Sequence, residues 1–156
     1  MKKLFIILLF LSLNAFGAGT ESSTDLSSDR SDQVNKLYEL AEKHIYNKNY
    51  DKSLKLLKKL TKQEDLGTKR ADIYNLLGFS YRKLENPNYD KSFAAYMMAL
   101  ELDPMHIGAH EYLGELYLMR NQKDKALAML DKLEKLAGKN TEEYKDLQKA
   151  IDDYQS

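Results

Sequence analysis

The sequence predicts an all-α protein in which three helix pairs stack in a row and a C-terminal capping helix closes the last pair. Apolar residues recur with a period near 3.6 from Asp32 almost to the end of the chain, as on the buried face of a helix. One pattern of aromatic and small residues occurs three times between residues 32 and 140, which indicates a repeated structural unit. Short stretches with Asn, Gly or Pro separate the periodic segments and predict the turns between helices.

The first 17 residues have the features of a secretory signal peptide. Two lysines precede an apolar run from Leu4 to Leu13, and small residues follow it. Cleavage is predicted after Gly17, and cleavage after Gly19 is the alternative. The apolar run is shorter than the roughly 20 residues that span a bilayer, which favours a cleaved signal over a retained membrane anchor. We therefore expect an exported protein, periplasmic if its source is a Gram-negative bacterium, with only transient membrane contact.

The next segment, residues 18–31, holds five serines and a single large apolar residue. Such a composition buries too little apolar surface to offset the entropy of ordering. It predicts a disordered leader that acts as a spacer, with a role as a tether as the alternative.

The first helix pair begins at Asp32. Its first helix is predicted to end at the turn 47–49, and its apolar face consists of Val34, Leu37, Leu40, Ala41 and His44. The apolar face of the second helix consists of Tyr50, Leu54, Leu57 and Leu60. Residues 61–70 then connect this pair to the next.

The middle unit, residues 71–106, shows the repeated pattern most completely. Aromatic residues, a Leu-Gly pair, small residues and a final proline occur in the order Tyr74, Leu77, Gly78, Tyr81, Tyr89, Ser92, Tyr96, Ala99 and Pro104. Gly78 has no side chain, so the second helix of the unit can approach the first closely, and the small Ser92 and Ala99 provide the complementary hollow. Pro104 ends the second helix, because proline removes a backbone donor and clashes with the preceding turn.

The same pattern recurs on both sides of the middle unit. The second helix of each unit begins with Tyr-Asp-Lys-Ser at 50–53, Tyr-Asp-Lys-Ser at 89–92 and Lys-Asp-Lys-Ala at 123–126. The small residues of the two helices are 12 residues apart in the outer units and 14 apart in the middle unit, where the extra residues fall in the turn 85–88. Over roughly residues 32–140 the chain resembles the tetratricopeptide repeat, an antiparallel helix pair of about 34 residues. The units are expected at about 34–67, 71–106 and 107–140.

The third unit is followed by the capping helix. Asp103 is predicted to cap the first helix of this unit, and its second helix is expected over 123–136 with Gly138 as the stop. The stretch 140–143, Asn-Thr-Glu-Glu, is typical of a helix start and opens the C-terminal segment 141–156. This last helix carries one apolar stripe, as a terminal cap needs, formed by Tyr144, Leu147, Ile151 and Tyr154.

The resemblance implies a right-handed α-solenoid that binds a peptide or loop of another protein in a concave groove lined by the first helix of each unit. In that family the groove positions correspond here to Asn35, Tyr38, Glu42, Ile45, Tyr46, Asp72, Asn75, Phe79, Arg82, Lys83, Gly108, Glu111, Glu115, Leu118 and Met119. The candidate protein-binding residues among them are Tyr38, Glu42, Tyr46, Asn75, Phe79, Arg82, Lys83, Glu111, Glu115 and Met119. Tyr38, Phe79 and Met119 are expected to act as apolar anchors, while Arg82 and the glutamates orient the partner. The lysine and asparagine of the family's carboxylate clamp are not matched, because those positions hold Tyr38, Glu42, Asn75 and Phe79.

Other classes of function lack their characteristic residues. The chain has 24 basic and 24 acidic residues, so it offers no basic excess to a nucleic acid. It has no cysteine, which excludes disulfides and thiol catalysis. A glycine-rich phosphate loop, a nucleophile elbow and paired catalytic carboxylates are not found either, so neither an enzyme nor a cofactor is predicted.

Two alternatives of other classes stay open. The array could be structural and form a homo-oligomer through its end faces, which light scattering with and without residues 139–156 distinguishes. His106 and His110 lie four residues apart, as metal ligands on one helix face do, so a metal-dependent activity is the second alternative. Structural roles for both histidines are favoured, because His106 lies at the start of a helix and His110 at an aromatic packing position.

Overall fold

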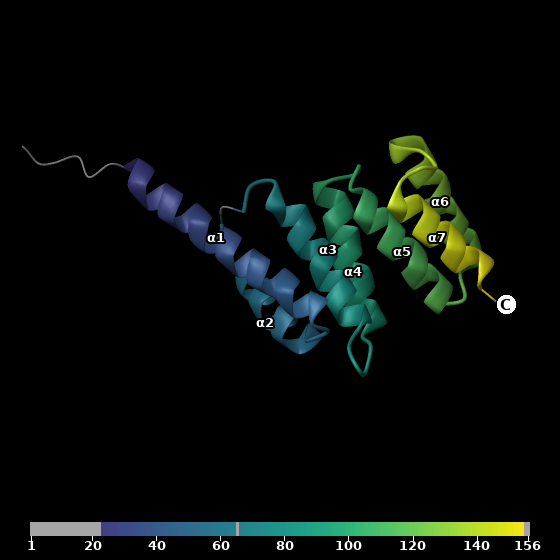
Figure 1. Cartoon of the computed structure of the whole chain (residues 1–156), viewed down its shortest axis with the longest axis horizontal. Helices are drawn as coiled ribbons and strands as arrows, with labels where there is room; N and C mark the ends of the chain where they lie inside the picture. Colours follow the sequence, from purple (N-terminus) through teal and green to yellow (C-terminus); the bar gives the residue numbers. More distant parts are fainter. Residues whose placement is uncertain (1–22, 65, 155–156) are drawn as a thin grey trace, which may run out of the picture.

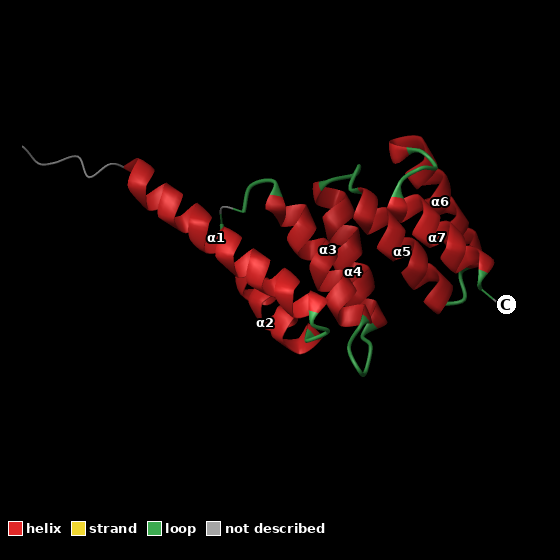
Figure 2. Cartoon of the chain, viewed as in Figure 1, coloured by secondary structure: helices red, strands yellow, loops and turns green. Residues whose placement is uncertain are grey.

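The computed structural model describes residues 23–64 and 66–154, which form seven helices and no strand (Figure 2). In chain order the helices are α1 (Ser23–Tyr46), α2 (Tyr50–Leu60), α3 (Lys69–Arg82), α4 (Tyr89–Leu102), α5 (Ile107–Met119), α6 (Lys123–Ala137) and α7 (Glu142–Asp152). Consecutive helices pack as the pairs α1–α2, α3–α4 and α5–α6, which stack along the long axis of the molecule, and α7 packs on both helices of the last pair (Figure 1). None of the described helices is long and apolar enough to cross a membrane.

The helices are arranged in two layers that differ in continuity. Each odd-numbered helix contacts the next one, through the contacts α1–α3, α3–α5 and α5–α7. Each even-numbered helix contacts odd-numbered helices on either side, but within the described residues the even-numbered helices do not contact one another. We call the continuous layer formed by α1, α3, α5 and α7 the odd-helix layer, and its outer side the odd-helix face.

Small residues allow the helices of a pair to cross closely, as the sequence predicts. Ser53, Ser92 and Ala126, the small residues of the second helices, are completely buried. The Ser92 hydroxyl donates a hydrogen bond of 2.8 Å to the carbonyl oxygen of Gly78. Each second helix also begins at the first residue of its repeated motif. The repeated motif therefore marks the places where the backbones meet.

The turns inside the helix pairs repeat as well. Lys48 and Asn121 both precede the second helix of their pair by two residues, and both have a positive φ, 58° and 57°. In the middle pair the turn over residues 83–88 is longer and contains no positive φ. The two additional residues predicted for the middle unit lie in this turn, where a solvated loop accommodates them.

The apolar core runs through the whole stack. One group of buried side chains joins the first two pairs around Leu57 and Ile73, a second surrounds Tyr96, and a third lies between α6 and α7. Tyr144, Leu147 and Ile151 of α7 belong to the third group and are buried. The predicted fold class, an all-α repeat with a C-terminal capping helix, is confirmed.

The N-terminal part differs from its prediction. Residues 23–31, predicted to belong to a disordered leader, form the first turns of α1. Val34 and Ala41 anchor α1 in the core, and extending an anchored helix by further turns requires no new nucleation. The predicted signal peptide, residues 1–17, and residues 18–22 lie outside the described residues.

Candidate functional site

The ten candidate residues lie on α1, α3 and α5 or, for Lys83, at the C-terminal cap of α3, so all belong to the odd-helix layer. Their exposure differs widely. The exposed candidates are Glu42, Tyr46, Lys83 and Met119. The half-buried candidates are Tyr38, Phe79 and Glu115, and the buried ones are Asn75, Arg82 and Glu111. These helices therefore do not present all candidate side chains to a partner, because the polar residues Asn75, Arg82 and Glu111 are buried within the protein.

Arg82 lies at the centre of a buried polar cluster between α3 and α5. Its Nη1 atom pairs with Oε2 of Glu115, and the Arg82 side chain is only 1% exposed against 24% for Glu115. The guanidinium carbon is 5.5 Å from the ring centroids of both Phe79 and Tyr112, and these two rings are 5.0 Å apart. Arg82 was predicted to orient the partner directly. The structure corrects this prediction, because the Arg82 side chain is buried, partly beneath Tyr112 of the next odd-numbered helix, and forms an ion pair with Glu115.

The cluster retains unused hydrogen-bonding groups. The Nε and Nη2 atoms of Arg82 and the hydroxyl of Tyr96 are buried without a hydrogen-bond partner among the described residues. Burial acts to lower the pKa of Arg82, but the neighbouring Tyr96 and Glu115 outweigh it and raise that pKa. The guanidinium therefore stays charged beneath the aromatic pair, where Glu115 is its one ion-pair partner in the described chain.

Glu111, one turn before Glu115 on α5, is a buried carboxyl group without a matching cation. Glu111 is only 7% exposed, and its carboxyl group forms no ion pair with the described residues. Burial raises the pKa of Glu111 to about 8, and the carboxylates of Glu115, Asp146 and Glu143 add to this, while Arg82 opposes it. Burial likewise raises the pKa of the adjacent Tyr112 to about 12. At neutral pH Glu111 is therefore mostly protonated in the free protein.

Glu111→Gln is expected to stabilise the protein at alkaline pH. The pKa of Glu111 is raised from 4.5 when unfolded to about 8 when folded, so the wild type loses stability as pH rises through this window. Glutamine has the same shape and no charge, so the variant should match the wild type below pH 4.5 and exceed it by about 2 kcal/mol above pH 8. Urea unfolding across this range measures the difference. Glu101→Gln, at an exposed position of α4, is the control, and parallel profiles for Glu111→Gln and the wild type would contradict the assignment.

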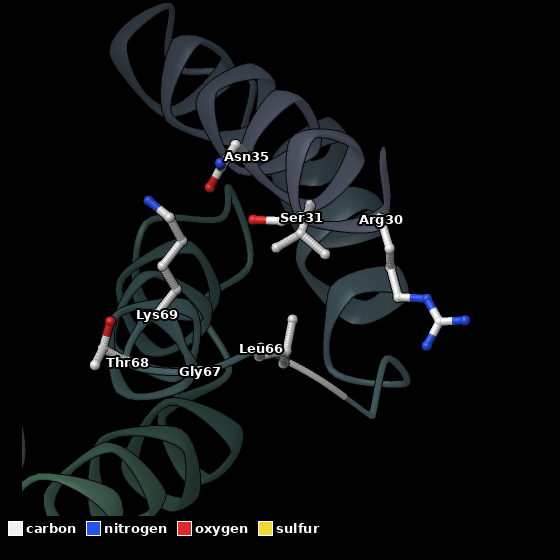
Figure 3. A pocket seen from close by; sticks show the side chains of 8 residues that line it. Arg30, Ser31, Asn35, Leu66, Gly67, Thr68 and Lys69 are labelled. Carbon is white, nitrogen blue, oxygen red and sulfur yellow. The ribbon is translucent and has the colours of Figure 1, made fainter. Parts of the chain in front are cut away.

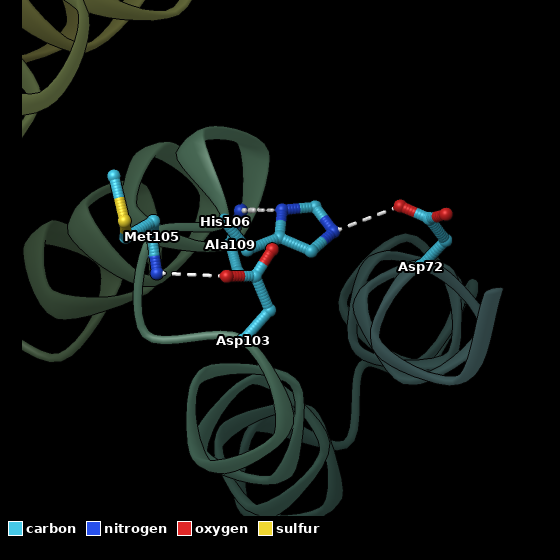
Figure 4. A network of polar contacts seen from close by, with 5 residues as sticks. All are labelled: Asp72, Asp103, Met105, His106 and Ala109. Atoms are coloured by element: carbon cyan, nitrogen blue, oxygen red, sulfur yellow. Dashed lines mark hydrogen bonds and ion pairs between the residues drawn. The ribbon is translucent and has the colours of Figure 1, made fainter. Parts of the chain in front are cut away.

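A second polar cluster joins α3 to the start of α5 (Figure 4). The Nδ1 atom of His106 accepts a hydrogen bond of 3.2 Å from the Ala109 amide and so caps α5. Nε2 of His106 must then carry the proton, and it donates to Oδ1 of Asp72 at 3.1 Å. Asp103, the predicted cap, instead accepts a bond of 2.9 Å from the Met105 amide. The prediction for Asp103 is wrong, because its side chain closes the turn that precedes the helix.

The two histidines of the alternative metal site, His106 and His110, make structural contacts, as the favoured prediction has it. His110 is buried, and its Nε2 donates to the carbonyl oxygen of Pro104 at 3.0 Å. His106 is engaged by Ala109 and Asp72 as described above. Over residues 23–64 and 66–154, no three His, Asp or Glu side chains are arranged to hold a metal ion. His106 thus joins α5 to α3, and His110 joins α5 to the turn that precedes it.

A pocket of about 220 Å³ lies between α1 and the start of α3 (Figure 3). It is lined by Arg30, Ser31, Val34, Asn35, Leu66, Gly67, Thr68 and Lys69. Next to it, Nζ of Lys69 lies 4.7 Å from the ring centroid of Tyr38. Burial raises the pKa of Tyr38, and the carboxylates of Glu42 and Asp72 add to this effect. The Lys69 ammonium group over the half-buried Tyr38 ring thus links α1 to the first residue of α3.

The repeated geometry matches a known family. Residues 84–151 match the family model described as tetratricopeptide repeat. These residues belong to the tetratricopeptide repeat family. No curated protein sequence matches the chain.

Solved structures share the tetratricopeptide architecture over most of the chain. The crystal structure of MamA is 21% identical, with a TM-score of 0.63, and the match covers 83% of this chain and 72% of that one. The type III secretion translocator chaperone SycD of Yersinia enterocolitica is 20% identical, with a TM-score of 0.64 and coverages of 86% and 96%. A chain of the CopN–Scc3 complex is 19% identical, with a TM-score of 0.61 and coverages of 90% and 79%. These similarities establish the fold.

Three residues of the site were not among the candidates taken from the tetratricopeptide positions. Tyr112 completes the aromatic pair, and Glu143 and Asp146 place negative charge near Glu111. The candidates came from the first helices of the three predicted units, whereas α7 extends the odd-helix layer by contacting α5. Adding the repeat length of about 34 residues to the start of α5 would have placed the last helix in this layer and indicated its acids.

Proposed function

We propose that this chain is an exported tetratricopeptide repeat protein that binds a peptide or loop of a cell-envelope partner on its odd-helix face, as an adaptor or assembly factor. The match to the tetratricopeptide repeat model supports a protein-binding role. Two structurally similar proteins support it too, since one is a translocator chaperone and the other is part of a protein complex. Export rests on the sequence of residues 1–17.

The aromatic pair Phe79–Tyr112 is the apolar part of the proposed site. Both rings are half-buried and stay in contact with solvent, although they lie on a charged guanidinium. Tyr50 packs against the edge of Phe79 at 6.2 Å and holds it in place. A rigid, partly exposed aromatic pair gives a partner side chain a large contact area at a small entropy cost.

The single observation that carries the proposal is the uncompensated carboxyl group of Glu111 beside these rings. A desolvated carboxyl group surrounded by other acids destabilises the fold, which is typical of a site kept for function. A lysine or arginine of the partner would supply the missing positive charge and allow Glu111 to ionise. The partner is therefore expected to present an apolar side chain next to a basic one.

Selection from a phage-displayed library of random peptides tests this proposal. The protein purified from cells that express the full chain serves as bait, and selected peptides are expected to combine an apolar and a basic residue. Phe79→Ala should weaken their binding by about tenfold or more, because it removes the central contact. Phe93→Ala is the matched control, because Phe93 is a half-buried aromatic residue on α4, outside the odd-numbered helices. Its ring centroid lies 6.1 Å from that of Tyr117. Equal affinities for the wild type and Phe79→Ala would contradict the proposal.

A further inference from the structure

The layer of even-numbered helices contains a groove between α2 and α4. The two helices both pack on α3 and do not contact each other, which leaves an open space of about 430 Å³. Its floor is a stripe of α3 at helical spacing, formed by Tyr74, Leu77 and Tyr81. Lys58 of α2 and Met98 of α4 lie on opposite walls.

The lining of this groove is apolar although it faces solvent. Leu77 is buried at the bottom, and the tyrosines on either side of it are half-buried. Met98 is 37% exposed, and Leu102, one turn further along α4, is 42% exposed. Between Lys91 and Met98 the α4 wall consists of the small Ala94 and Ala95, so the floor stays accessible. A contiguous exposed apolar strip of this kind is typical of a surface that contacts another molecule.

Two lysines stand over the groove from opposite walls. Nζ of Lys58 is 5.2 Å and Nζ of Lys91 is 5.7 Å from the ring centroid of Tyr81. Neither lysine forms an ion pair with a described residue, and Asp90, next to Lys91, pairs with Arg120 instead. Two like charges that face the same ring repel each other, and a carboxylate placed between them would be attracted by both.

The surroundings on α2 reinforce this positive potential. The helix has one acidic residue, Asp51, and four lysines, at positions 52, 55, 58 and 59. The odd-helix face has the opposite character, since carboxylates gather around Glu111 there. The chain as a whole is balanced in charge, so the basic character is local to this wall of the groove.

We propose that the groove between α2 and α4 binds an acidic segment of a protein partner. An aliphatic side chain of that segment fills the space over Tyr74, Leu77 and Tyr81, and its carboxylates meet Lys58 and Lys91. Charge complementarity selects this occupant, because the positive groups border an open apolar space of about 430 Å³. An anionic membrane or a nucleic acid backbone would need a broad basic surface without such a cavity. The groove shares no residue with the site proposed above around Phe79, Glu111 and Tyr112, which we call the odd-helix site, so it does not depend on that function.

The test uses the same random peptide library and the double variant Lys58→Glu/Lys91→Glu. A class of selected peptides is expected to carry Asp or Glu next to Leu, Ile or Phe, and the double variant should bind this class about a hundredfold more weakly. Lys36→Glu/Lys132→Glu is the matched control, since both lysines are exposed and distant in sequence from the groove, and it should keep the affinity within about threefold. Ala94→Gln fills the groove without changing charge and should also weaken binding.

Two outcomes would overturn the groove proposal. One is that no acidic peptide is selected, or that the selected acidic peptides bind the double variant as well as the wild type. The other is that only phosphatidylglycerol vesicles or duplex DNA, used as parallel probes, bind in a manner that requires Lys58 and Lys91. Peptides that depend on Phe79 but not on these lysines concern the odd-helix site alone, so the failures of the two proposals are distinguishable.

Discussion

Gly78→Ala is expected to lower the free energy of unfolding by about 3 kcal/mol, because an added methyl group has no space at the crossing of α3 and α4. A Cβ at Gly78 would lie 2.5 Å from the Cδ1 and Cε1 atoms of Tyr96. The Tyr96 ring is completely buried and packs with Leu113 and Leu116, so it cannot move aside without disturbing the core. Intrinsic helix propensity alone would favour alanine by about 1 kcal/mol, so the sign of the change in urea unfolding is decisive.

Gly108→Ala is the control for this substitution. A Cβ at Gly108 would have the side-chain amide of Asn75 as its nearest neighbour, at 3.2 Å, so the expected change stays within about 1 kcal/mol. In the Gly78→Ala background, Tyr96→Leu should cost less than it does in the wild type, since it removes the clashing ring. A Gly78→Ala protein as stable as the wild type would contradict the close crossing.

Glu115→Ala is expected to destabilise the protein by about 3 kcal/mol, because it leaves the buried Arg82 guanidinium without an anion. Arg82→Met should cost less, since the remaining Glu115 carboxylate is 24% exposed and partly hydrated. The double variant Arg82→Met/Glu115→Ala should be more stable than Glu115→Ala alone. Urea unfolding of the four proteins measures the coupling free energy.

The exposed pair of Lys135 and Asp131 on α6 provides the comparison. Both side chains are more than half exposed, so breaking this pair should change stability by less than about 0.5 kcal/mol. Equal and additive losses for Glu115→Ala and Arg82→Met would show that burial does not couple them, which is contrary to the geometry.

The features that the sequence predicts well are local or repeated. Helix periodicity, the repeated start of each second helix and the small residues at the crossings are visible in three copies, and the structure places them as expected. Each depends on contacts within one helix pair, where spacing along the chain determines position in space.

The features that the sequence does not predict depend on contacts between pairs. Arg82 and Glu115 occupy positions of the same face, but only the packing of α5 on α3 brings Tyr112 over the guanidinium and joins the two charges. The N-cap of α5 is His106 and not the predicted Asp103 for a similar reason, because Asp72 of the preceding helix pair also holds the His106 side chain. Side-chain exposure at such positions is determined by the neighbouring helix, which a single repeat motif does not encode.

The most direct test of the odd-helix site is a titration of the isotope-labelled protein with a selected peptide, monitored through the amide chemical shifts. The peptide is one whose binding does not require Lys58 or Lys91. The largest changes are predicted on α3 and α5, around Phe79, Glu111 and Tyr112, and Phe79→Ala should greatly reduce them. Changes confined to the even-numbered helices or to the free side of α7, or a library that yields no such peptide, would contradict a partner site on this face.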